Sequence, residues 1–297
     1  MTGVLTLVAT TPFALDDSTA RRAAAALARL GAKPGELKWL SPTRALDLPF
    51  KGPASEATES ALRRAFSGQP VDIAVQAATD RRKRLLVADM DMTMIPVETL
   101  DEIAVLAGQG TAIAEITARA MNGEIDFAGA LRQRLAMLAG LDVEIVDRVL
   151  EATRLSPGGM ALVHTMRAHG AYTALVTGGF RPFSRKVREL AGFHEDHAND
   201  LRTEGGRLTG GVVEPIFGRE GKLEVLRGLC IERNIPPSAA AAVGDGANDL
   251  PMLTEAGLGD AYHAKPAVSA RARFRVDHGD LRTLLYLQGY TDEEVVE

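Results

Sequence analysis

The amino-acid sequence predicts an α/β protein in which a doubly wound parallel sheet carries a helical bundle inserted after its first strand. Three observations support this fold class. Short apolar runs alternate with helical patterns from residue 85 onwards. Three of those runs end in loops rich in Asp, Thr or Gly. A stretch of about sixty residues with helical periodicity alone separates the first run from the second. A separate α+β unit precedes this arrangement.

Composition bounds what the chain can do. Its 297 residues, 46% hydrophobic and 25% charged, are enough for two or three folding units. A net charge of −5 does not favour binding to nucleic acid or to an anionic membrane surface. No apolar run approaches the roughly 20 residues that span a bilayer. The single cysteine, Cys230, suits a reducing compartment, and Met1–Asp17 lacks the basic start of a signal peptide. We therefore expect a cytoplasmic protein with no nucleic-acid or membrane partner.

Residues 1–80 are predicted to form the α+β unit. Their pattern is strand, helix, two extended pieces, helix, strand, over Val4–Ala9, Arg21–Leu30, Leu37–Leu40, Arg44–Leu48, Ser55–Phe66 and Val71–Gln76. Gly31 and Gly68 are expected to end the two helices. This βαββαβ order is typical of a ferredoxin-like layer of antiparallel sheet and two helices. By topology alone it resembles ACT-type regulatory domains, and a unit that only dimerises or shields the rest fits the pattern equally well.

A basic run, Arg81-Arg82-Lys83-Arg84, marks the junction between this unit and the α/β core. Because the whole chain is acidic, we interpret the run as a solvated linker and strand start and not as a nucleic-acid patch. The predicted division is an ACT-like unit over 1–80, a core over 81–96 and 152–297, and a helical cap over 97–151.

The first strand of the core is predicted over Leu85–Ala88, four apolar residues that suit a buried position. Asp89 and Asp91 follow, beyond the carboxyl edge where open α/β sheets bind ligands. Two acids so close repel each other unless a cation such as Mg²⁺, which prefers oxygen ligands, holds them ionised. An acidic turn would give the same local pattern, so the later motifs decide between these interpretations.

The cap is predicted from apolar residues that recur at helical spacing, around Val97–Leu106, Ile113–Ala120, Leu131–Leu138 and Val143–Leu150. Its position makes it a natural lid over the site. Further helices are expected over Pro157–Ala168, Arg181–Leu190, Lys222–Arg233 and Leu281–Leu287, and strands over Ala171–Val176, Ala239–Val243 and Arg273–Val276. The Gly-, Asn- and Asp-rich stretch Gly192–Gly211 is interpreted as a hairpin or flap.

Polar loops follow three of the predicted strands, at Asp89 to Asp91, at Thr177-Gly178-Gly179 and at Asp245 to Asp249. Because the carboxyl ends of parallel strands lie side by side, these loops should meet in one pocket, where Lys222 could join them. Carboxylates for a cation, together with a hydroxyl, an ammonium and amide donors, are what phosphoryl transfer requires. His194 and His197 have no cysteine near them and are interpreted as surface residues, not zinc ligands.

The ordered motifs resemble those of the haloacid dehalogenase superfamily of phosphatases, which has a Rossmann-like core. The resemblance covers roughly residues 85–277 and rests on Asp89-x-Asp91-x-Thr93, Thr177-Gly178-Gly179, Lys222 and Gly244-Asp245-Gly246-x-Asn248-Asp249. It implies that Asp89 is a nucleophile and Asp91 a general acid and base. It also implies Mg²⁺ held by Asp89, Asp91 (through its backbone carbonyl) and Asp245, with Asp249 behind them, and phosphoryl oxygens held by Thr177, Gly178, Lys222 and Asn248.

The cap resembles that of the phosphoserine phosphatase family in three segments, Val97–Asp101, Met121–Phe127 and Leu131–Leu135. The resemblance implies that Glu98 holds the substrate ammonium, that Arg134 holds its carboxylate, and that Met121 and Phe127 form apolar walls. The expected reaction is hydrolysis of O-phospho-L-serine to L-serine and phosphate, the last step of L-serine biosynthesis. Two residues depart from the pattern: Thr177 stands where serine is usual, and Met92 where a serine is common.

Other functions fit parts of the pattern. A phosphotransferase would pass the phosphoryl group to an alcohol instead of water, and a regulatory protein would carry a vestigial site. A receiver domain also combines acids, Thr and Lys, but it lacks an inserted helical lid. The ACT resemblance leaves L-serine feedback and a homodimer as open expectations.

Overall fold

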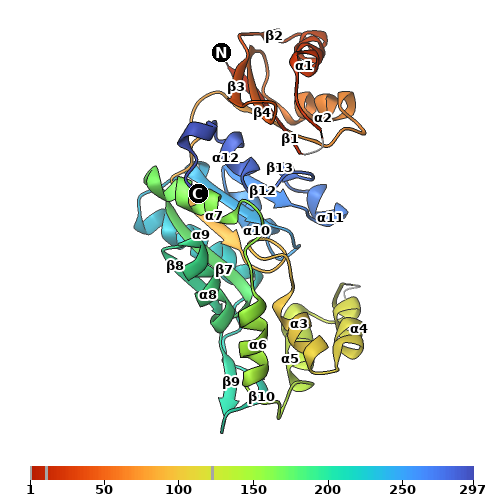
Figure 1. Ribbon diagram of the computed structural model, residues 1–297, viewed down its shortest axis with the longest axis vertical. Coiled ribbons are helices and arrows are strands. Elements are labelled where there is room, and N and C mark those ends of the chain that lie inside the picture. Colours follow the sequence, from red (N-terminus) through yellow and green to blue (C-terminus); the bar gives the residue numbers. More distant parts are fainter. Residues whose placement is uncertain (1, 11–12, 122–123) are drawn as a thin grey trace.

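The computed structural model describes residues 2–10, 13–121 and 124–297, and the side chain of Met121 lies outside that description. Figure 1 shows an elongated molecule. The N-terminal unit lies at one end, the parallel sheet in the middle, and the helical cap with a long hairpin at the other end.

The N-terminal unit is an antiparallel sheet packed against two helices. The sheet order is β2-β4-β1-β5, and β3 also pairs with β4. Its core contains Leu5 from the sheet together with Leu27 and Leu62 from the helices. The predicted ferredoxin-like order is confirmed, with one extra short strand, β2. The elements are β1 (Gly3–Ala9), α1 (Asp17–Arg29), β2 (Lys33–Pro34), β3 (Lys38–Ser41), β4 (Ala45–Lys51), α2 (Glu56–Ala65) and β5 (Val71–Ala77).

The core contains a six-stranded, fully parallel sheet of order β13-β12-β11-β6-β7-β8. Its central strand, β6, is buried on both faces because its side chains alternate between two apolar clusters. Leu86 and Ala88 face one cluster, and Leu85 and Val87 the other. The predicted doubly wound sheet is therefore confirmed. The strands are β6 (Leu85–Asp89), β7 (Tyr172–Phe180), β8 (Glu195–Asn199), β11 (Ala240–Gly244), β12 (Leu258–Tyr262) and β13 (Phe274–Val276).

Helices cover both faces of this sheet (Figure 1). Side chains of α7 and α8 join the cluster that contains Leu86, and side chains of α9 and α10 join the cluster that contains Leu85. One expectation about the strands was wrong, and one strand was not expected. Residues 195–199 form the edge strand β8 and not part of a flap, and β12 was not predicted, because both sequences contain residues that strands disfavour. The helices are α7 (Gly159–Ala168), α8 (Arg181–Ala191), α9 (Arg219–Glu232), α10 (Leu250–Glu255), α11 (Pro266–Ser269) and α12 (Thr283–Leu287).

The inserted cap consists of α3 (Thr99–Leu106), α4 (Gly110–Met121), α5 (Phe127–Ala136) and α6 (Glu144–Ala152). The hairpin of β9 (Leu201–Glu204) and β10 (Arg207–Val212) packs beside it (Figure 1), so this part of the predicted flap is confirmed. The backbone of Leu208 accepts a hydrogen bond from Gly140 at 2.8 Å and donates one to Leu141 at 2.9 Å. The cap and the hairpin therefore form one structural unit.

The N-terminal unit is joined to the core by buried polar contacts. The Asp72 carboxylate accepts hydrogen bonds from the backbone N–H groups of Asp277 and Gly279, both at 2.7 Å. Arg81 pairs with Asp47 and donates to the carbonyl oxygen of Leu287. Our interpretation of the basic run as a solvated linker is wrong for Arg81 and for Lys83, which is only 7% exposed.

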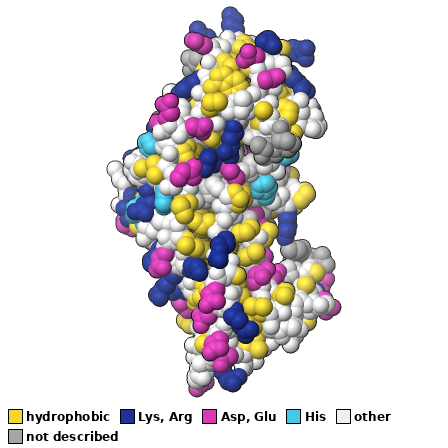
Figure 2. All heavy atoms as spheres, in the orientation of Figure 1, with side chains coloured by type: hydrophobic (Ala, Val, Ile, Leu, Met, Phe, Trp, Pro, Cys, Tyr) yellow, Lys and Arg dark blue, Asp and Glu magenta, His cyan; other side chains and the backbone are white. Residues whose placement is uncertain are grey.

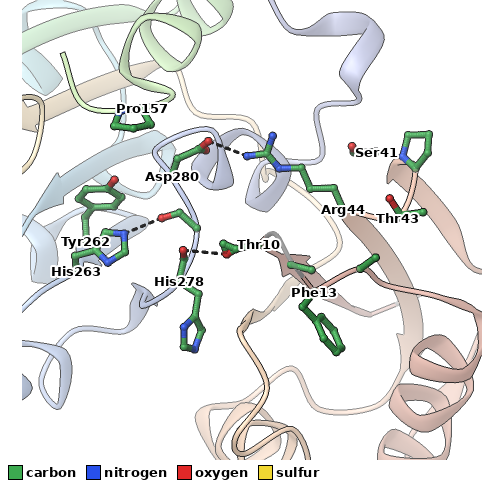
Figure 3. Close-up of a pocket in the computed structure, with 14 residues that line it drawn as sticks. Thr10, Phe13, Ser41, Thr43, Arg44, Pro157, Tyr262, His263, His278 and Asp280 are labelled. Carbon is green, nitrogen blue, oxygen red and sulfur yellow. Dashed lines mark hydrogen bonds and ion pairs between the residues drawn. The ribbon is translucent and has the colours of Figure 1, made fainter. Parts of the chain in front are cut away.

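A cavity of about 640 Å³ lies at this junction. Thr10, Phe13 and Arg44 line it from the N-terminal unit, and His278 and Asp280 line it from the core (Figure 3). Arg44 and Asp280 form an ion pair of 2.9 Å across the junction.

The remaining surface carries charges of both signs. On the face drawn in Figure 2, acidic and basic side chains are interspersed and neither sign dominates. Among the described residues, no helix has both the length and the apolar character that crossing a bilayer requires.

We predict that Asp260→Asn stabilises the protein more at high pH than at low pH. Burial, and then repulsion by Asp72, raise the pKa of the Asp260 carboxyl from 3.8 to about 8. Between pH 3.8 and about pH 8 the native state binds more protons than the unfolded state, so rising pH lowers the stability of the parent protein. The variant cannot ionise and escapes this loss. Its Tm advantage should grow by several °C, to order of magnitude, between about pH 5 and about pH 8.5.

Thermal unfolding at both pH values measures this effect. Asp147→Asn, at an exposed position in α6, serves as the matched control and should show no such growth. A Tm difference for Asp260→Asn that stays constant with pH would contradict the prediction.

Candidate active site

The predicted polar residues meet at the carboxyl edge of the parallel sheet. Asp89 is the last residue of β6 and lies beside Val176 of β7, one residue before Thr177. On the other side of β6, Ala88 pairs with Val243 of β11, which leads into the loop that carries Asp245 and Asp249. The strand register therefore brings residues from three distant parts of the chain together, as the sequence predicted.

Lys222 lies at the centre of this edge and is completely buried. It belongs to the first turn of α9, which begins at Arg219 and not at Lys222 as expected. Its ammonium group forms two ion pairs of 2.6 Å, one with Asp89 Oδ1 and one with Asp249 Oδ1. Burial alone would lower the pKa of Lys222, but Asp249 and Asp89 outweigh it and the pKa is raised. The lysine therefore stays charged and holds the two carboxylates together.

Negative charge exceeds positive charge at this point. One carboxylate oxygen from each of Asp89, Asp245 and Asp249 lies within 4.8 Å of the others, and the Lys222 ammonium pairs with two of them, Asp89 and Asp249. Burial and then repulsion by Asp249 raise the pKa of Asp89 well above its ordinary value and that of Asp245 to about 6. A hard divalent cation with oxygen ligands would relieve this repulsion, so the donor set fits Mg²⁺. Among the described residues, no other such group of potential metal ligands is found.

Asp91 points toward β7 and the start of the cap. Its Oδ1 accepts a hydrogen bond from the Thr99 backbone N–H at 3.0 Å, and its Oδ2 accepts one from the Thr177 hydroxyl at 3.2 Å. Burial raises the pKa of Asp91, and these hydrogen bonds only partly oppose it. A carboxyl group with a raised pKa is suited to donate a proton. Gly179 leaves room for it, since a Cβ there would lie 2.7 Å from Asp91 Oδ2.

Two charged residues of the cap lie in this electrostatic field. Burial, and then repulsion by Asp91 and Asp245, raise the pKa of Glu98, which precedes α3, to about 7. Burial lowers the pKa of Arg134 in α5, while attraction by Asp101 and Glu98 opposes that effect. Arg134 Nε is buried without a hydrogen-bond partner in the described part of the chain. An unpaired buried donor of this kind is available to an anionic group of a ligand.

Phe127 connects the cap to the loops of the core. A Cβ at Gly178 would lie 2.9 Å from its ring, and one at Gly218 would lie 3.1 Å away, so the phenyl group covers both glycines. Asn248 lies against Gly246, where a Cβ would be 2.1 Å from its Oδ1. The side chain of Met121, the other predicted apolar wall, lies outside the described residues.

Asn199 is a site-positioning residue that the sequence analysis missed. It ends β8, is 2% exposed, and donates hydrogen bonds from Nδ2 to the carbonyl oxygens of Gly178 at 2.9 Å and Phe217 at 2.8 Å. Its Oδ1 accepts one from the Phe217 backbone N–H at 2.7 Å. This side chain holds the loop after β10 against the end of β7. The expectation that Thr177, Gly178 and Gly179 form a loop beyond the strand was wrong, because β7 continues to Phe180. Recognising β8 as a parallel strand would have identified Asn199, because it lies at the carboxyl end of that strand.

Comparisons with known proteins identify a family and several similar proteins. A family model described as haloacid dehalogenase-like hydrolase matches residues 86–254. A Streptomyces coelicolor protein named phosphoserine phosphatase is 42% identical over 256 residues, which are 86% of this chain and 62% of the relative. The chain thus spans about three fifths of that relative's length.

Two further proteins are similar over more of their own length. A Lactococcus lactis protein named phosphoserine phosphatase is 40% identical over 213 residues, which are 71% of this chain and 99% of that protein. The crystal structure of a probable phosphoserine phosphatase from Vibrio cholerae, in unliganded form, has a TM-score of 0.77 and 29% identity. It aligns with 97% of this chain, and 86% of its own chain is covered.

We predict that Mg²⁺ stabilises the protein against heat and that Asp245→Asn weakens this effect. A cation that binds only the native state raises the free energy of unfolding, by about 2.7 kcal/mol when its concentration is a hundred times its Kd. The Tm rises as a result. Removing the Asp245 charge removes one of the three clustered carboxylates. Thermal unfolding with millimolar Mg²⁺ and with EDTA measures both effects. Asp147→Asn is the control, and an Mg²⁺-induced Tm shift that is equal in all three proteins would rule out this site.

Proposed function

The chain belongs to the haloacid dehalogenase-like hydrolase family, and from that premise we propose that it hydrolyses O-phospho-L-serine to L-serine and phosphate. The activity corresponds to the last step of L-serine biosynthesis. One observation carries the choice of substrate: a carboxylate, Glu98, and a guanidinium, Arg134, extend from the cap into the electrostatic field of the Asp89, Asp245 and Asp249 cluster. Phosphoserine carries an ammonium, a carboxylate and a phosphate, which these three features match.

The proposed reaction is a double displacement. Asp89 attacks phosphorus, so that a bond forms between its carboxylate oxygen and phosphorus while the bond from phosphorus to the seryl oxygen breaks. Asp91 gives its proton to the departing seryl oxygen. In the second step Asp91 takes a proton from water, the water oxygen bonds to phosphorus, and the Asp89 carboxylate is released. The hydrogen bonds that Asp91 accepts from Thr99 and Thr177 keep its carboxyl group oriented for both transfers.

Several residues would stabilise charge on the transferring group. Lys222, the Thr177 hydroxyl, the Gly178 amide and Asn248 would hold the phosphoryl oxygens, and removing one donor of this kind costs on the order of 10²-fold or more in rate. The carboxylates of Asp89 and Asp245 and the Asp91 carbonyl would hold Mg²⁺, with Asp249 and Lys222 fixing their positions. When bound, the cation supplies positive charge that lets the nucleophile approach an anionic phosphate.

The cap would provide specificity and exclude water. Glu98 would pair with the substrate ammonium and Arg134 with its carboxylate, while Phe127 would cover the phosphate-binding end of β7 at Gly178. Met121 would form part of the same apolar wall.

We predict that the parent chain releases phosphate from O-phospho-L-serine with Mg²⁺ but not with EDTA, and that Asp89→Asn abolishes this activity. Removing a nucleophile from a concerted set of groups costs on the order of 10⁴-fold or more in kcat. Asp147→Asn is the matched control and should keep the parent rate. Undiminished turnover by Asp89→Asn would exclude the proposed nucleophile. Transfer of phosphate to an added alcohol such as homoserine, instead of to water, would indicate a phosphotransferase.

We predict that Arg134→Ala lowers kcat/KM for phosphoserine by about 10- to 100-fold, as expected when a charged hydrogen-bond partner is lost. Phosphoethanolamine has no carboxylate, so its kcat/KM should be nearly unchanged. Arg132→Ala is the matched control: it lies in the same helix, but its side chain is exposed and pairs with Glu214. Equal losses on both substrates, or equal effects of both variants, would refute the assignment of Arg134 as the carboxylate anchor.

We further infer that the N-terminal unit is regulatory, with L-serine as feedback ligand, and that the chain forms a homodimer. The junction cavity supports L-serine binding, because Arg44 and Asp280 offer charges opposite to those of an amino acid (Figure 3). L-Serine should raise the Tm of the full chain, and Arg44→Gln should reduce that shift while Arg21→Gln should not. Analytical ultracentrifugation measures the oligomeric state, and we expect the mass of a dimer. A monomer with no response to millimolar L-serine would refute both inferences.

A cytoplasmic location is proposed on the single cysteine alone.

A further inference from the structure

Basic side chains gather at the amino edge of the parallel sheet, at the opposite ends of the strands from the catalytic residues. Two adjoining hollows of about 380 and 390 Å³ share Arg167 and His194. Arg84 and Arg233 line the first hollow, and His164 lines the second. We call this set of five residues the basic hollow. Arg84 immediately precedes β6, whereas Asp89 ends it, so the two sites lie about 17 Å apart along the strand.

Arg84 is the member of the basic run 81–84 that the fold does not use. Arg81 pairs with Asp47, and Arg82 pairs with Glu294. Lys83 donates to the carbonyl oxygens of Asp80 and Ser238 at 2.9 Å. Arg84 has no ion pair within the described part of the chain, and its side chain is exposed at the hollow. The junction therefore accounts for three of the four cations and leaves the guanidinium of Arg84 available.

Aromatic packing holds two other side chains of the hollow in place, those of Arg233 and His194. The Arg233 guanidinium lies 3.2 Å from the centroid of the Tyr172 ring, and His194 stacks on the same ring at 4.4 Å with 18° between the planes. The Tyr172 hydroxyl donates a hydrogen bond to Glu195 at 2.9 Å. Arg167 donates to the Gly192 carbonyl oxygen. These contacts fix the positions of the cations and reduce the entropy that a bound anion would have to offset.

Acids beside this edge neutralise only part of its positive charge. Glu195 lies 2.9 Å from His197, and Glu232 forms an ion pair of 3.4 Å with Arg233. Arg84 and Arg167 form no ion pair within the described residues. Desolvation, and then repulsion by Arg167 and Arg233, lower the pKa of His194. Helix termini explain part of the pattern, since Arg167 and Arg233 lie at the ends of α7 and α9. They do not explain Arg84, which immediately precedes a strand, or why three guanidinium groups converge in a chain of net charge −5.

We propose that the basic hollow binds a small anion that carries two phosphate groups, at a site separate from the catalytic one. Planar guanidinium groups bind phosphate oxygens in pairs of parallel hydrogen bonds, and three of them line a space of the right size. The two hollows meet at Arg167, which places one phosphate between Arg84 and Arg233 and the second toward His164. Both faces of Tyr172 contact Arg233 and His194, so the site offers charge and not an aromatic face to its ligand.

Calorimetric titration of the full chain with pyrophosphate, without Mg²⁺, tests this proposal. The variant Arg84→Gln/Arg167→Gln/Arg233→Gln should bind pyrophosphate at least 10-fold more weakly than the parent. The matched control, Arg21→Gln/Arg29→Gln/Arg64→Gln, removes the same charge from exposed positions of the N-terminal helices and should bind like the parent. Inorganic phosphate should bind the parent at least 10-fold more weakly than pyrophosphate. Arg84→Gln alone, at an exposed position, gives the same test if the triple variant fails to fold.

Several outcomes would overturn the proposal. Equal weakening in the two triple variants would show adventitious attraction by net charge only. Pyrophosphate binding that survives in the basic-hollow variant would place the anion in the catalytic cleft. Equal affinity for phosphate and pyrophosphate would refute the assignment of two phosphate subsites. Phosphate release from phosphoserine should stay at the parent rate in both triple variants, so this test is independent of the proposed activity.

Discussion

The active-site edge depends on one buried ammonium group. Lys222 lies between Asp89 and Asp249, both within 2.6 Å, and all three side chains are removed from water. Charges in that position are tolerated only as a matched set, because the loss of one partner leaves another uncompensated. The set also fixes geometry, since its members come from β6, α9 and the loop after β11. The same contact that makes the burial of charge acceptable therefore aligns three parts of the chain that are far apart in sequence.

The cap is tied to the same edge through Asp91. The Asp91 carboxylate accepts a hydrogen bond from the first residue of α3, Thr99, so the group proposed to transfer protons also anchors the start of the cap. The other end of the cap returns to the same loop, where the Ser156 N–H donates to the Met94 carbonyl oxygen at 2.8 Å. These contacts tie the orientation of the Asp91 carboxyl group to the position of the cap.

The sequence predicted those parts of the molecule whose local pattern agrees with their environment. β6 and β11 are apolar runs buried on both faces, and their carboxyl ends carried the polar residues of the site. β8 was not predicted because an edge strand tolerates polar residues. β12 was not predicted because Gly259 interrupts its apolar pattern. That glycine is required, since a Cβ there would lie 1.7 Å from the Leu253 carbonyl oxygen. Missing β8 also hid Asn199. The partners of the basic run could not be predicted, because Asp47 and Glu294 lie in distant segments.

The parallel sheet separates charge by direction. Every strand of the core sheet runs the same way, so all carboxyl ends share one edge and all amino ends share the other. Excess acid collects at the first edge, around Asp89 and Asp245, where it favours a cation. Arginine side chains collect at the second edge, around Arg84, where they favour an anion. Arg84 precedes the first residue of β6, and Asp89 is its last residue. The net charge of −5 therefore conceals two local electrostatic fields of opposite sign, one at each end of this strand.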